Sequence, residues 1–352
     1  MLKQDILTPA LLLDLDAFEA NLTRMMDQAT HSGKALRPHA KAHKCVEIAK
    51  RQLAAGACGV CVATLAEAEL MSQGGISGLL LTSPVADPRK IERIVQTGAL
   101  VVVDHLQQVA WYQAAAHKAG RQVSVLVDLD VGDHRTGAAS FEQAVAIAEA
   151  IDRASHLQLR GLQAYAAAGS HIMPYEDRVL NSRQTFAHAG AVRDALTGKG
   201  MPIEIISGGS TGTWLIDTAL PEPTELQVGS FVLMDMDYGR ADVDFQRVIT
   251  VLGTVVSANH QSFVTVDAGT KSFSTDRGYG PEAVGVAGSS FRFGGDEFGW
   301  LDVDNPANRP HLGDKIEFIP PHCDPTVNLY NRIYALRGDQ VEAVWPVKGL
   351  TV

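Results

Sequence analysis

The chain has 352 residues, of which 46% are apolar and 20% are charged, so it is long enough for a barrel-sized domain with a smaller second domain. Its 30 basic and 40 acidic residues give a net charge of −10, which argues against a nucleic-acid or anionic-membrane partner. The opening residues, MLKQDILTPALLLDLD, contain no long apolar run and no cleavage-like site, so we expect neither a signal peptide nor a membrane span.

Short apolar runs alternate with helix-like segments up to about residue 235. The helix-like segments include TLAEAELMSQ and FEQAVAIAEAIDR. The candidate strands are KALRPHAK, GVCVAT, GLLLTS, LVVVDH, SVLVDLD, LRGLQAY, IEIISGG and LQVGSFVLM. Eight such strand–helix units predict an α/β fold, a (β/α)8 barrel over residues 15–240. A doubly wound parallel sheet is the alternative that the strand count leaves open.

After about residue 240 the pattern changes to β-branched, alternating segments separated by turn residues. These segments are RVITVLGTVVSA, SFVTVDAG, KIEFIPP, NLYNRIYALRG and QVEAVWPV. They predict a smaller all-β domain. We assign residues 1–14 and 241–352 to this domain.

The four cysteines give no sign of a zinc ribbon. Cys58 and Cys61 have the C-x-x-C spacing, but Cys45 and Cys323 form no second pair of that kind. The segment GACGVCVAT reads as a buried strand, in which small apolar residues pack in the core. Free thiols fit a reducing compartment, and we expect a cytoplasmic protein.

The segment ALRPHAKAHK concentrates basic residues on one predicted strand. Because side chains alternate along a strand, Arg37, His39, Lys41 and His43 would share one face, and Lys44 would lie on the other. Cations facing a barrel interior are costly unless they meet anions or form a site, although a solvent-exposed edge segment is the simpler alternative. A lysine among cations has a lowered pKa and can act as an amine nucleophile, as a Schiff base with an aldehyde cofactor requires.

Pyridoxal 5'-phosphate, an aldehyde cofactor, also needs a phosphate-binding loop. The segment SGGSTGT, residues 207–213, follows the seventh predicted strand, and VGSF, residues 228–231, lies at the eighth. Barrels often bind phosphate with the loops after these two strands. The candidate phosphate ligands are Ser207, Gly208, Gly209, Thr211, Gly212, Gly229 and Ser230.

A third segment, PPHCDPTVN, places His322, Cys323 and Asp324 side by side between prolines. All three residue types bind metals, so the segment could be a metal site, a nucleophile or a hydrogen-bonded polar turn.

Taken together, these motifs resemble the D-threonine aldolase / D-serine dehydratase family of fold-type III pyridoxal-phosphate enzymes, which is related to alanine racemase. The resemblance covers nearly the whole chain, and its motifs occur in the family's order. They are TPALLLDLDAFEANL, RPHAKAHK, LDVGDHRTG, GLQAY, GGSTGT, ELQVGSFVLMD, VDAGTKSFS and HCDPTVNL.

The resemblance implies a role for several residues. Lys41 would form the Schiff base with the cofactor, and Arg135 would lie near the phenolic oxygen of its ring. Gln163 and Tyr165, two apart on one strand, would both reach the cofactor. His171 would be the base that acts on the substrate hydroxyl. One departure from the family pattern is QAYAAAGSH, in which Ala166 and Ala167 replace a His–Gly pair, so the substrate range is open at this point.

The resemblance also implies that His322 and Asp324 bind a divalent metal. In an extended segment these two side chains would point the same way, and Cys323 would point away from them as a packing residue. A carboxylate favours Mn²⁺ or Mg²⁺, with Co²⁺ or Zn²⁺ as alternatives.

The implied activity is retro-aldol cleavage of β-hydroxy-D-amino acids, with D-threonine as the reference substrate that gives glycine and acetaldehyde. The alternatives are dehydration of D-serine or D-threo-3-hydroxyaspartate, a 3-hydroxy-D-aspartate aldolase, a racemase that needs no metal, and a cofactor carrier without catalysis. Family resemblance suggests a homodimer in which the β-domain of one chain lies near the active site of the other.

Overall fold

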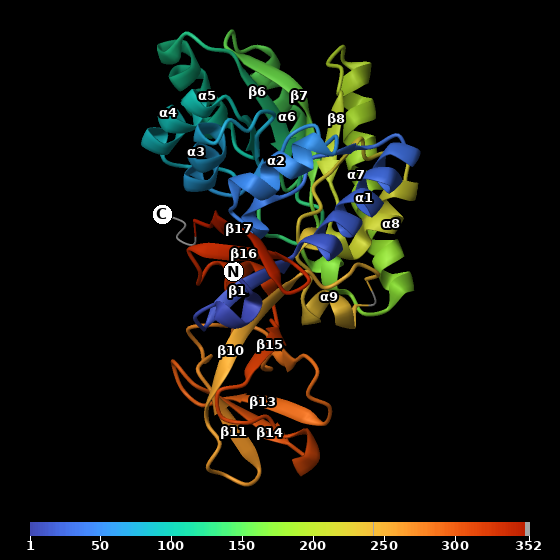
Figure 1. Ribbon diagram of the computed structural model, residues 1–352. Helices are drawn as coiled ribbons and strands as arrows, with labels where there is room; N and C mark the ends of the chain where they lie inside the picture. The colour runs from blue at the N-terminus through green and yellow to red at the C-terminus, as the bar shows by residue number, and fades with distance from the viewer. Residues whose placement is uncertain (242, 349–352) are drawn as a thin grey trace. The chain divides into compact units, whose positions relative to one another are not determined.

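The computed structural model describes residues 1–241 and 243–348, which fold into two compact units (Figure 1). The barrel unit comprises Arg24–Lys41 and Val46–Gly229. The β unit comprises Met1–Thr23, Ala42–Cys45 and the described residues between Ser230 and Lys348. The sequence-based domain limits at residues 15 and 240 remain predictions.

Eight parallel strands form the sheet of the barrel unit. They are β2 (Ala35–Leu36), β3 (Cys61–Val62), β4 (Leu80–Leu81), β5 (Leu100–Val103), β6 (Val123–Asp128), β7 (Leu157–Ala164), β8 (Ile205–Gly208) and β9 (Glu225–Leu226). The strands are ordered β2-β9-β8-β7-β6-β5-β4-β3, and every pair is parallel. A parallel bridge between His39 and Cys61 joins the two ends of this series, so the sheet closes into a ring. The predicted (β/α)8 barrel is confirmed.

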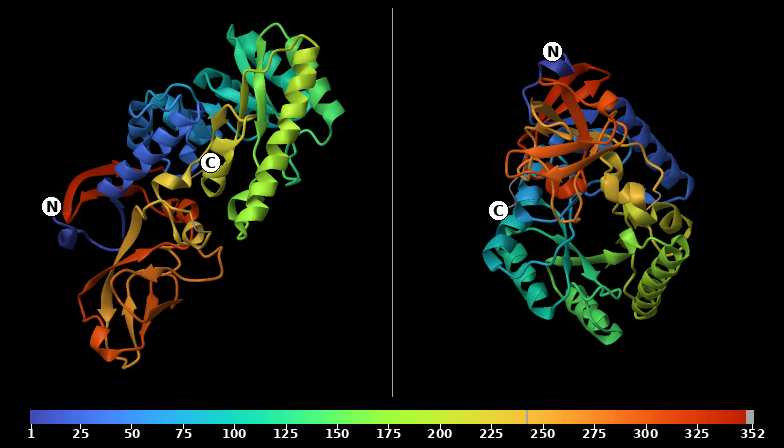
Figure 2. Two further views of the ribbon diagram at one scale, coloured as in Figure 1. Left: turned by 90° about the vertical axis from the view of Figure 1, so that its right-hand side faces the viewer. Right: turned by 90° about the horizontal axis from the view of Figure 1, so that it is seen from below.

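Helices follow the strands and cover the outside of the sheet. They are α2 (Val46–Ala54), α3 (Leu65–Gln73), α4 (Pro88–Thr97), α5 (Leu106–Ala119), α6 (Phe141–Asp152), α7 (Tyr175–Gly198) and α8 (Trp214–Ala219). Helix α1 (Leu15–His31) precedes β2, and its residues are divided between the two units. Side-chain caps fix several helix starts: Thr64, Asp87 and Ser140 accept a main-chain N–H at the beginning of α3, α4 and α6. The long helix α7 runs beside β7, as the yellow-green helix in Figure 2 shows.

The core of the barrel unit lies between these helices and the strands. Val101, Val103, Val125 and Val127 are fully buried on the strands, and the apolar face of α4 packs in the same cluster through residues such as Ile91. Their burial is the main favourable term that holds the ring together. The ring in turn fixes the carboxyl ends of the strands, where barrel enzymes carry their chemistry.

The β unit is built on a nine-stranded, mostly antiparallel sheet. Its strands are β1 (Ala10–Asp14), β10 (Ile249–Ser257), β11 (Phe263–Val266), β12 (Glu282–Ala283), β13 (Ser289–Phe293), β14 (Gly299–Val303), β15 (Lys315–Ile319), β16 (Arg332–Arg337) and β17 (Gln340–Pro346). Strand β1 pairs antiparallel with β10 and parallel with β16, so the first strand of the chain lies between two strands from its C-terminal third. Two short helices, α9 (Met236–Arg240) and α10 (Cys323–Val327), complete the unit.

The predicted strand over residues 34–41 is only partly correct. Ala35 and Leu36 pair with β9, and Arg37 and His39 donate main-chain hydrogen bonds to Leu226 and Val228. Lys41 instead lies in the 3-10 turn Ala40–Ala42, so strand alternation does not extend to it. Among the described residues, no helix is long and apolar enough to cross a membrane.

Candidate active site

A cavity of about 300 Å³ lies within the barrel unit, where several of its strands end. It is lined by His39, Lys41, Ala63, Thr82, Ser83, Pro84, Arg135, Thr136, Gln163, Tyr165 and Gln227. Four residues chosen from the sequence, Lys41, Arg135, Gln163 and Tyr165, therefore meet in one cavity. Lys41 and Arg135 place positive charge there, which suits an anionic ligand.

The turn that carries Lys41 is fixed by its own neighbours. The main-chain N–H of Lys41 donates to Nδ1 of His39 at 3.4 Å, and Nε2 of His39 lies 3.0 Å from the hydroxyl of Thr82. Lys44 differs, because its ammonium bonds to the side-chain oxygen of Asn328 within the β unit. Lys41 thus lies in the cavity wall, and Lys44 does not line this cavity. The choice of Lys41 as the cofactor lysine stays a prediction, and its strand-face argument does not hold because Lys41 lies in a turn.

Arg135 lies in the loop between β6 and α6. Asp130 folds this loop by accepting the main-chain N–H groups of Gly132 and His134 at 2.9 and 3.1 Å. These bonds, with the imidazole of His134 at 2.8 Å, hold the pKa of Asp130 below its usual range even though burial opposes them. The guanidinium of Arg135 lies 5.3 Å from the centre of the Tyr165 ring, so a cation–π contact orients both side chains.

Buried polar side chains lie next to the cavity, and the sequence analysis did not identify the central one, Asp128. Asp128, the last residue of β6, accepts hydrogen bonds from Nε2 of Gln163 and from the hydroxyl of Thr136, both at 2.8 Å. Burial raises the pKa of Asp128 to about 6. The segment VLVDLD could have revealed Asp128, because it places a carboxylate at the carboxyl end of a predicted barrel strand.

The predicted phosphate loop folds around a buried carboxylate. Asp217 accepts the main-chain N–H of Ser210 at 3.3 Å and the hydroxyl of Thr213, and burial raises its pKa to about 6. Gly209 has a φ of +78°, a left-handed conformation that glycine adopts without strain. A Cβ atom on Gly212 would lie 1.9 Å from the carbonyl oxygen of Ser170.

This close approach packs the turn Thr211–Thr213 against the turn Ala168–His171, and thus brings the segment of His171 to the loop. The other predicted phosphate ligands lie in different segments of the chain. The hydroxyl of Ser207 points into the barrel, where it donates to Glu225 at 2.7 Å. Gly208 ends β8, Gly229 is the last residue of the barrel unit, and Ser230 is the first residue of the next segment of the β unit.

His322 and Asp324 lie in the β unit, and their segment is not extended as the sequence predicted. His322 is extended, but helix α10 begins at Cys323, so strand alternation does not apply to Asp324. At the start of this helix, the carboxylate of Asp235 accepts the main-chain N–H of Cys323 at 2.8 Å. Cys323 is fully buried.

The chemistry of this pair fits a metal with open coordination positions. Nδ1 of His322 lies 2.8 Å from a carboxylate oxygen of Asp276, the arrangement by which metal-binding histidines are commonly oriented, with Nε2 left for an ion. Asp324 would add a hard oxygen ligand. Within residues 1–241 and 243–348, no group of three or more His, Cys, Asp and Glu side chains gathers to hold an ion.

The two cysteines of the C-x-x-C pair differ: Cys61 packs in the core as the sequence predicted, whereas Cys58 is exposed, so the prediction is wrong for Cys58. Cys61 is fully buried, and burial raises the pKa of its thiol well above the usual range. Burial, with the charge of Glu225, raises the pKa of Cys58 to about 11. Both thiols are free, and a raised pKa disfavours the thiolate that a nucleophile needs.

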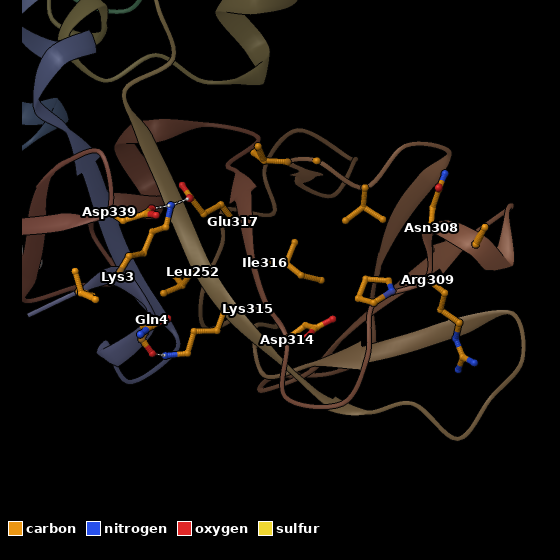
Figure 3. A pocket seen from close by; sticks show the side chains of 16 residues that line it. Lys3, Gln4, Leu252, Asn308, Arg309, Asp314, Lys315, Ile316, Glu317 and Asp339 are labelled. Atoms are coloured by element: carbon orange, nitrogen blue, oxygen red, sulfur yellow. Dashed lines mark hydrogen bonds and ion pairs between the residues drawn. The ribbon is translucent and has the colours of Figure 1, made fainter.

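A larger cavity, of about 620 Å³, lies in the β unit (Figure 3). In its wall, Lys3 forms ion pairs with Glu317 and Asp339 at 2.8 and 2.7 Å, and Lys315 donates to the carbonyl oxygen of Gln4. It contains none of the candidate site residues. The smaller cavity in the barrel unit therefore remains the candidate active site, because it combines a lysine, an arginine and buried polar groups.

Comparison with known proteins identifies the family. Residues 13–237 match the model of the alanine racemase N-terminal domain, and residues 249–336 match that of a putative serine dehydratase domain. The chain is 36% identical to 3-hydroxy-D-aspartate aldolase of Paracoccus denitrificans strain Pd 1222 over 98% of its own length and 92% of that protein's. It belongs to the D-threonine aldolase / D-serine dehydratase family.

Two further relatives agree with this assignment. The D-threonine aldolase of Arthrobacter sp. is 37% identical over 97% of this chain and 92% of its own. The crystal structure of D-threonine aldolase from Filomicrobium marinum superposes with a TM-score of 0.95 and 35% identity, over 98% of this chain and 96% of that one. Members of the D-threonine aldolase / D-serine dehydratase family have the fold of fold-type III pyridoxal-phosphate enzymes. The family and the carbon–carbon lyase class predicted from the sequence are thus confirmed.

Proposed function

We propose that the protein cleaves β-hydroxy-D-amino acids by a retro-aldol reaction that depends on pyridoxal phosphate and a divalent metal, and that D-threonine gives glycine and acetaldehyde. The observation that carries the proposal is the cavity in which Lys41, Arg135 and Tyr165 meet at the end of the barrel strands. The 36–37% identity to two named aldolases supports the reaction class. Pyridoxal phosphate, when bound, supplies the electron sink for cleavage of the Cα–Cβ bond.

The aldehyde, the ring oxygen and the phosphate of the cofactor each have candidate partners among the residues chosen from the sequence. Lys41 would bind the aldehyde carbon, and Arg135 would face the ring oxygen. The loop Ser207–Thr213, with Gly229 and Ser230, would offer main-chain N–H groups to the phosphate. Asp217 would hold that loop in shape from below, because its carboxylate already accepts the Ser210 N–H and the Thr213 hydroxyl.

The remaining residues would act on the substrate hydroxyl. His322 and Asp324 would hold the metal, for which Mn²⁺ or Mg²⁺ is favoured by the carboxylate, and the metal would lower the pKa of the hydroxyl. His171 would take its proton. Ala166, where the family has His, would leave more room for the substrate side chain, whereas Ala167, where the family has Gly, adds a methyl group. We further propose a homodimer located in the cytoplasm.

A 3-hydroxy-D-aspartate aldolase is the second candidate, because a relative with that name is as similar as the D-threonine aldolase. The purified protein should be incubated with pyridoxal phosphate, Mn²⁺ and either D-threonine or D-threo-3-hydroxyaspartate, and the products identified. Glycine with acetaldehyde or glyoxylate supports an aldolase and ranks the two substrates. A keto acid with ammonia as the main product would instead establish a dehydratase.

The role of His171 has its own test. His171→Ala should slow cleavage by roughly 10²- to 10⁴-fold, the usual contribution of a general base, while the absorbance of the bound cofactor remains. Normal cleavage by this variant would remove His171 from the mechanism.

A further inference from the structure

A continuous chain of buried polar side chains crosses the interior of the barrel unit and ends at the cavity. It starts at the ion pair between Arg37 and Glu225, whose side chains are 8% and 5% exposed. It continues through Ser207 and Gln227 to Gln163, and Gln227 and Gln163 both line the cavity. The direction in which each hydrogen bond donates can be followed along this chain, because its ends have fixed donor and acceptor roles.

From the ion-pair end, Glu225 can only accept. The guanidinium of Arg37 donates to it at 2.7 Å. Burial by itself lowers the pKa of Arg37, but the hydrogen bond and charge of Glu225 outweigh that effect and raise it. The hydroxyl of Ser207 must therefore donate to Glu225, at 2.7 Å. Its oxygen is left to accept, so the atom of Gln227 that lies 3.0 Å away must be the NH₂ group.

At the other end of the chain of hydrogen bonds, Gln163 independently shows that the NH₂ group of Gln227 is a donor. One end of its amide lies 2.9 Å from the carbonyl oxygen of Thr82, which cannot donate, and 2.8 Å from Asp128. That end is therefore the NH₂ group, and the other end is the carbonyl oxygen, which accepts from Gln227 at 3.1 Å. Both N–H bonds of Gln227 are thus used inside the protein.

The remaining polar side-chain atom of Gln227 is its carbonyl oxygen Oε1. Gln227 is 3% exposed and lines the cavity, and none of the side-chain hydrogen bonds found in residues 1–241 and 243–348 donates to this oxygen. The buried network therefore leaves an acceptor, and not a donor, on the Gln227 side of the cavity. A ligand group that meets Gln227 must bring its own hydrogen.

We propose that Gln227 is a cofactor-binding residue that accepts a hydrogen bond from the protonated ring nitrogen of pyridoxal phosphate. This inference rests on the proposed function, in which Lys41, Arg135 and the glycine-rich loop take the aldehyde carbon, the ring oxygen and the phosphate. Of the cofactor's polar groups, the ring nitrogen is then left, and it can donate only when protonated. A protonated ring withdraws electrons more strongly than a neutral one, as cleavage of a carbon–carbon bond at Cα requires.

The test uses the holoenzyme reconstituted with pyridoxal phosphate that carries ¹⁵N in its ring. The ¹⁵N NMR signal of the wild-type protein should lie in the pyridinium range at neutral pH. Gln227→Leu, which removes the acceptor, should move the signal to the pyridine range and weaken cofactor binding about tenfold or more, the effect of losing a hydrogen bond to a charged group. Gln227→Glu keeps an acceptor oxygen and should keep the pyridinium signal.

Gln52→Leu is the matched control, because Gln52 is another fully buried glutamine of the barrel unit that does not line the cavity. It should leave the ring signal where the wild type has it. A pyridine signal in the wild type would overturn the inference even if the variants fail to fold, and so would a pyridinium signal that survives in Gln227→Leu. If either of these two NMR results is found in a protein that cleaves D-threonine normally, the proposed function still holds and only the role of Gln227 is wrong. A wild-type protein that takes up no cofactor would overturn the proposed function and the role of Gln227 together.

Discussion

The buried pair of Arg37 and Glu225 gives the sharpest test of how the barrel interior is stabilised. Glu225 accepts from Arg37 and from Ser207, both at 2.7 Å, and Arg37 also donates to the carbonyl oxygen of Gly78. Glu225→Ala removes the carboxylate and leaves a guanidinium inside the protein without its counter-charge. Breaking a buried pair in this way costs about 3 to 5 kcal/mol, because the remaining charge stays desolvated.

This cost should be visible in thermal unfolding. For a unit of this size, 1 kcal/mol shifts the midpoint by about 2 to 4 °C, so Glu225→Ala should lower Tm by roughly 6 to 20 °C. Replacing both partners by apolar residues, as in Arg37→Met with Glu225→Leu, leaves no unpaired charge and should cost less than Glu225→Ala alone. Circular dichroism at neutral pH, followed on the protein without cofactor, measures both variants and the single changes Arg37→Met and Glu225→Leu.

Glu69→Ala is the matched control. Glu69 pairs with Arg93 at 2.7 Å in the same unit, but Arg93 is 62% exposed, so its loss should cost less than about 1 kcal/mol. If Glu225→Ala were no more destabilising than Glu69→Ala, or if the double replacement cost the sum of its two single changes, the electrostatic argument would be wrong.

Three further predictions concern the site itself. Lys41→Ala should abolish the absorbance of bound pyridoxal phosphate and D-threonine cleavage, while Lys44→Ala keeps both; the reverse result would assign the cofactor to Lys44. Alanine at both His322 and Asp324 should remove the bound divalent ion, and unchanged metal content by elemental analysis would reject this site. The pKa of Asp217 is raised by burial from 3.8 to about 6, so its contribution to stability is full below pH 3.8 and is lost as the pH rises through 6. Each pH unit of the difference is worth about 1.4 kcal/mol, so Asp217→Asn should reduce the loss of stability between pH 4 and 7.5 by about 3 kcal/mol, and an unchanged pH dependence in denaturant titrations would contradict it.

The sequence by itself determined the barrel and most of the second sheet. Buried parallel strands need continuous apolar runs such as LVVVDH, and half-buried strands need alternation such as QVEAVWPV, so both kinds could be predicted from pattern alone. The hairpin of β13 and β14 was missed because SSFRF and GWLDV are flanked by glycines and charges that read as loop. The family motifs also pointed to Lys41, Arg135 and Tyr165, which the structure gathers around one cavity.

Tertiary structure alone decided what these residues can do. Pattern placed Lys41 on a strand, but the chain leaves the sheet after His39 and turns, because the ring of strands closes there through the bridge to Cys61. Pattern also made Asp324 part of an extended segment, whereas Asp235, almost 90 residues earlier in the chain, holds the start of a helix at Cys323. The acceptor that Gln227 leaves for the cavity depends on Glu225 and Gln163, which come from different strands. Hydrogen-bond direction in a buried network is set by such partners, which are close in space and remote in the chain, so no local pattern can reveal it.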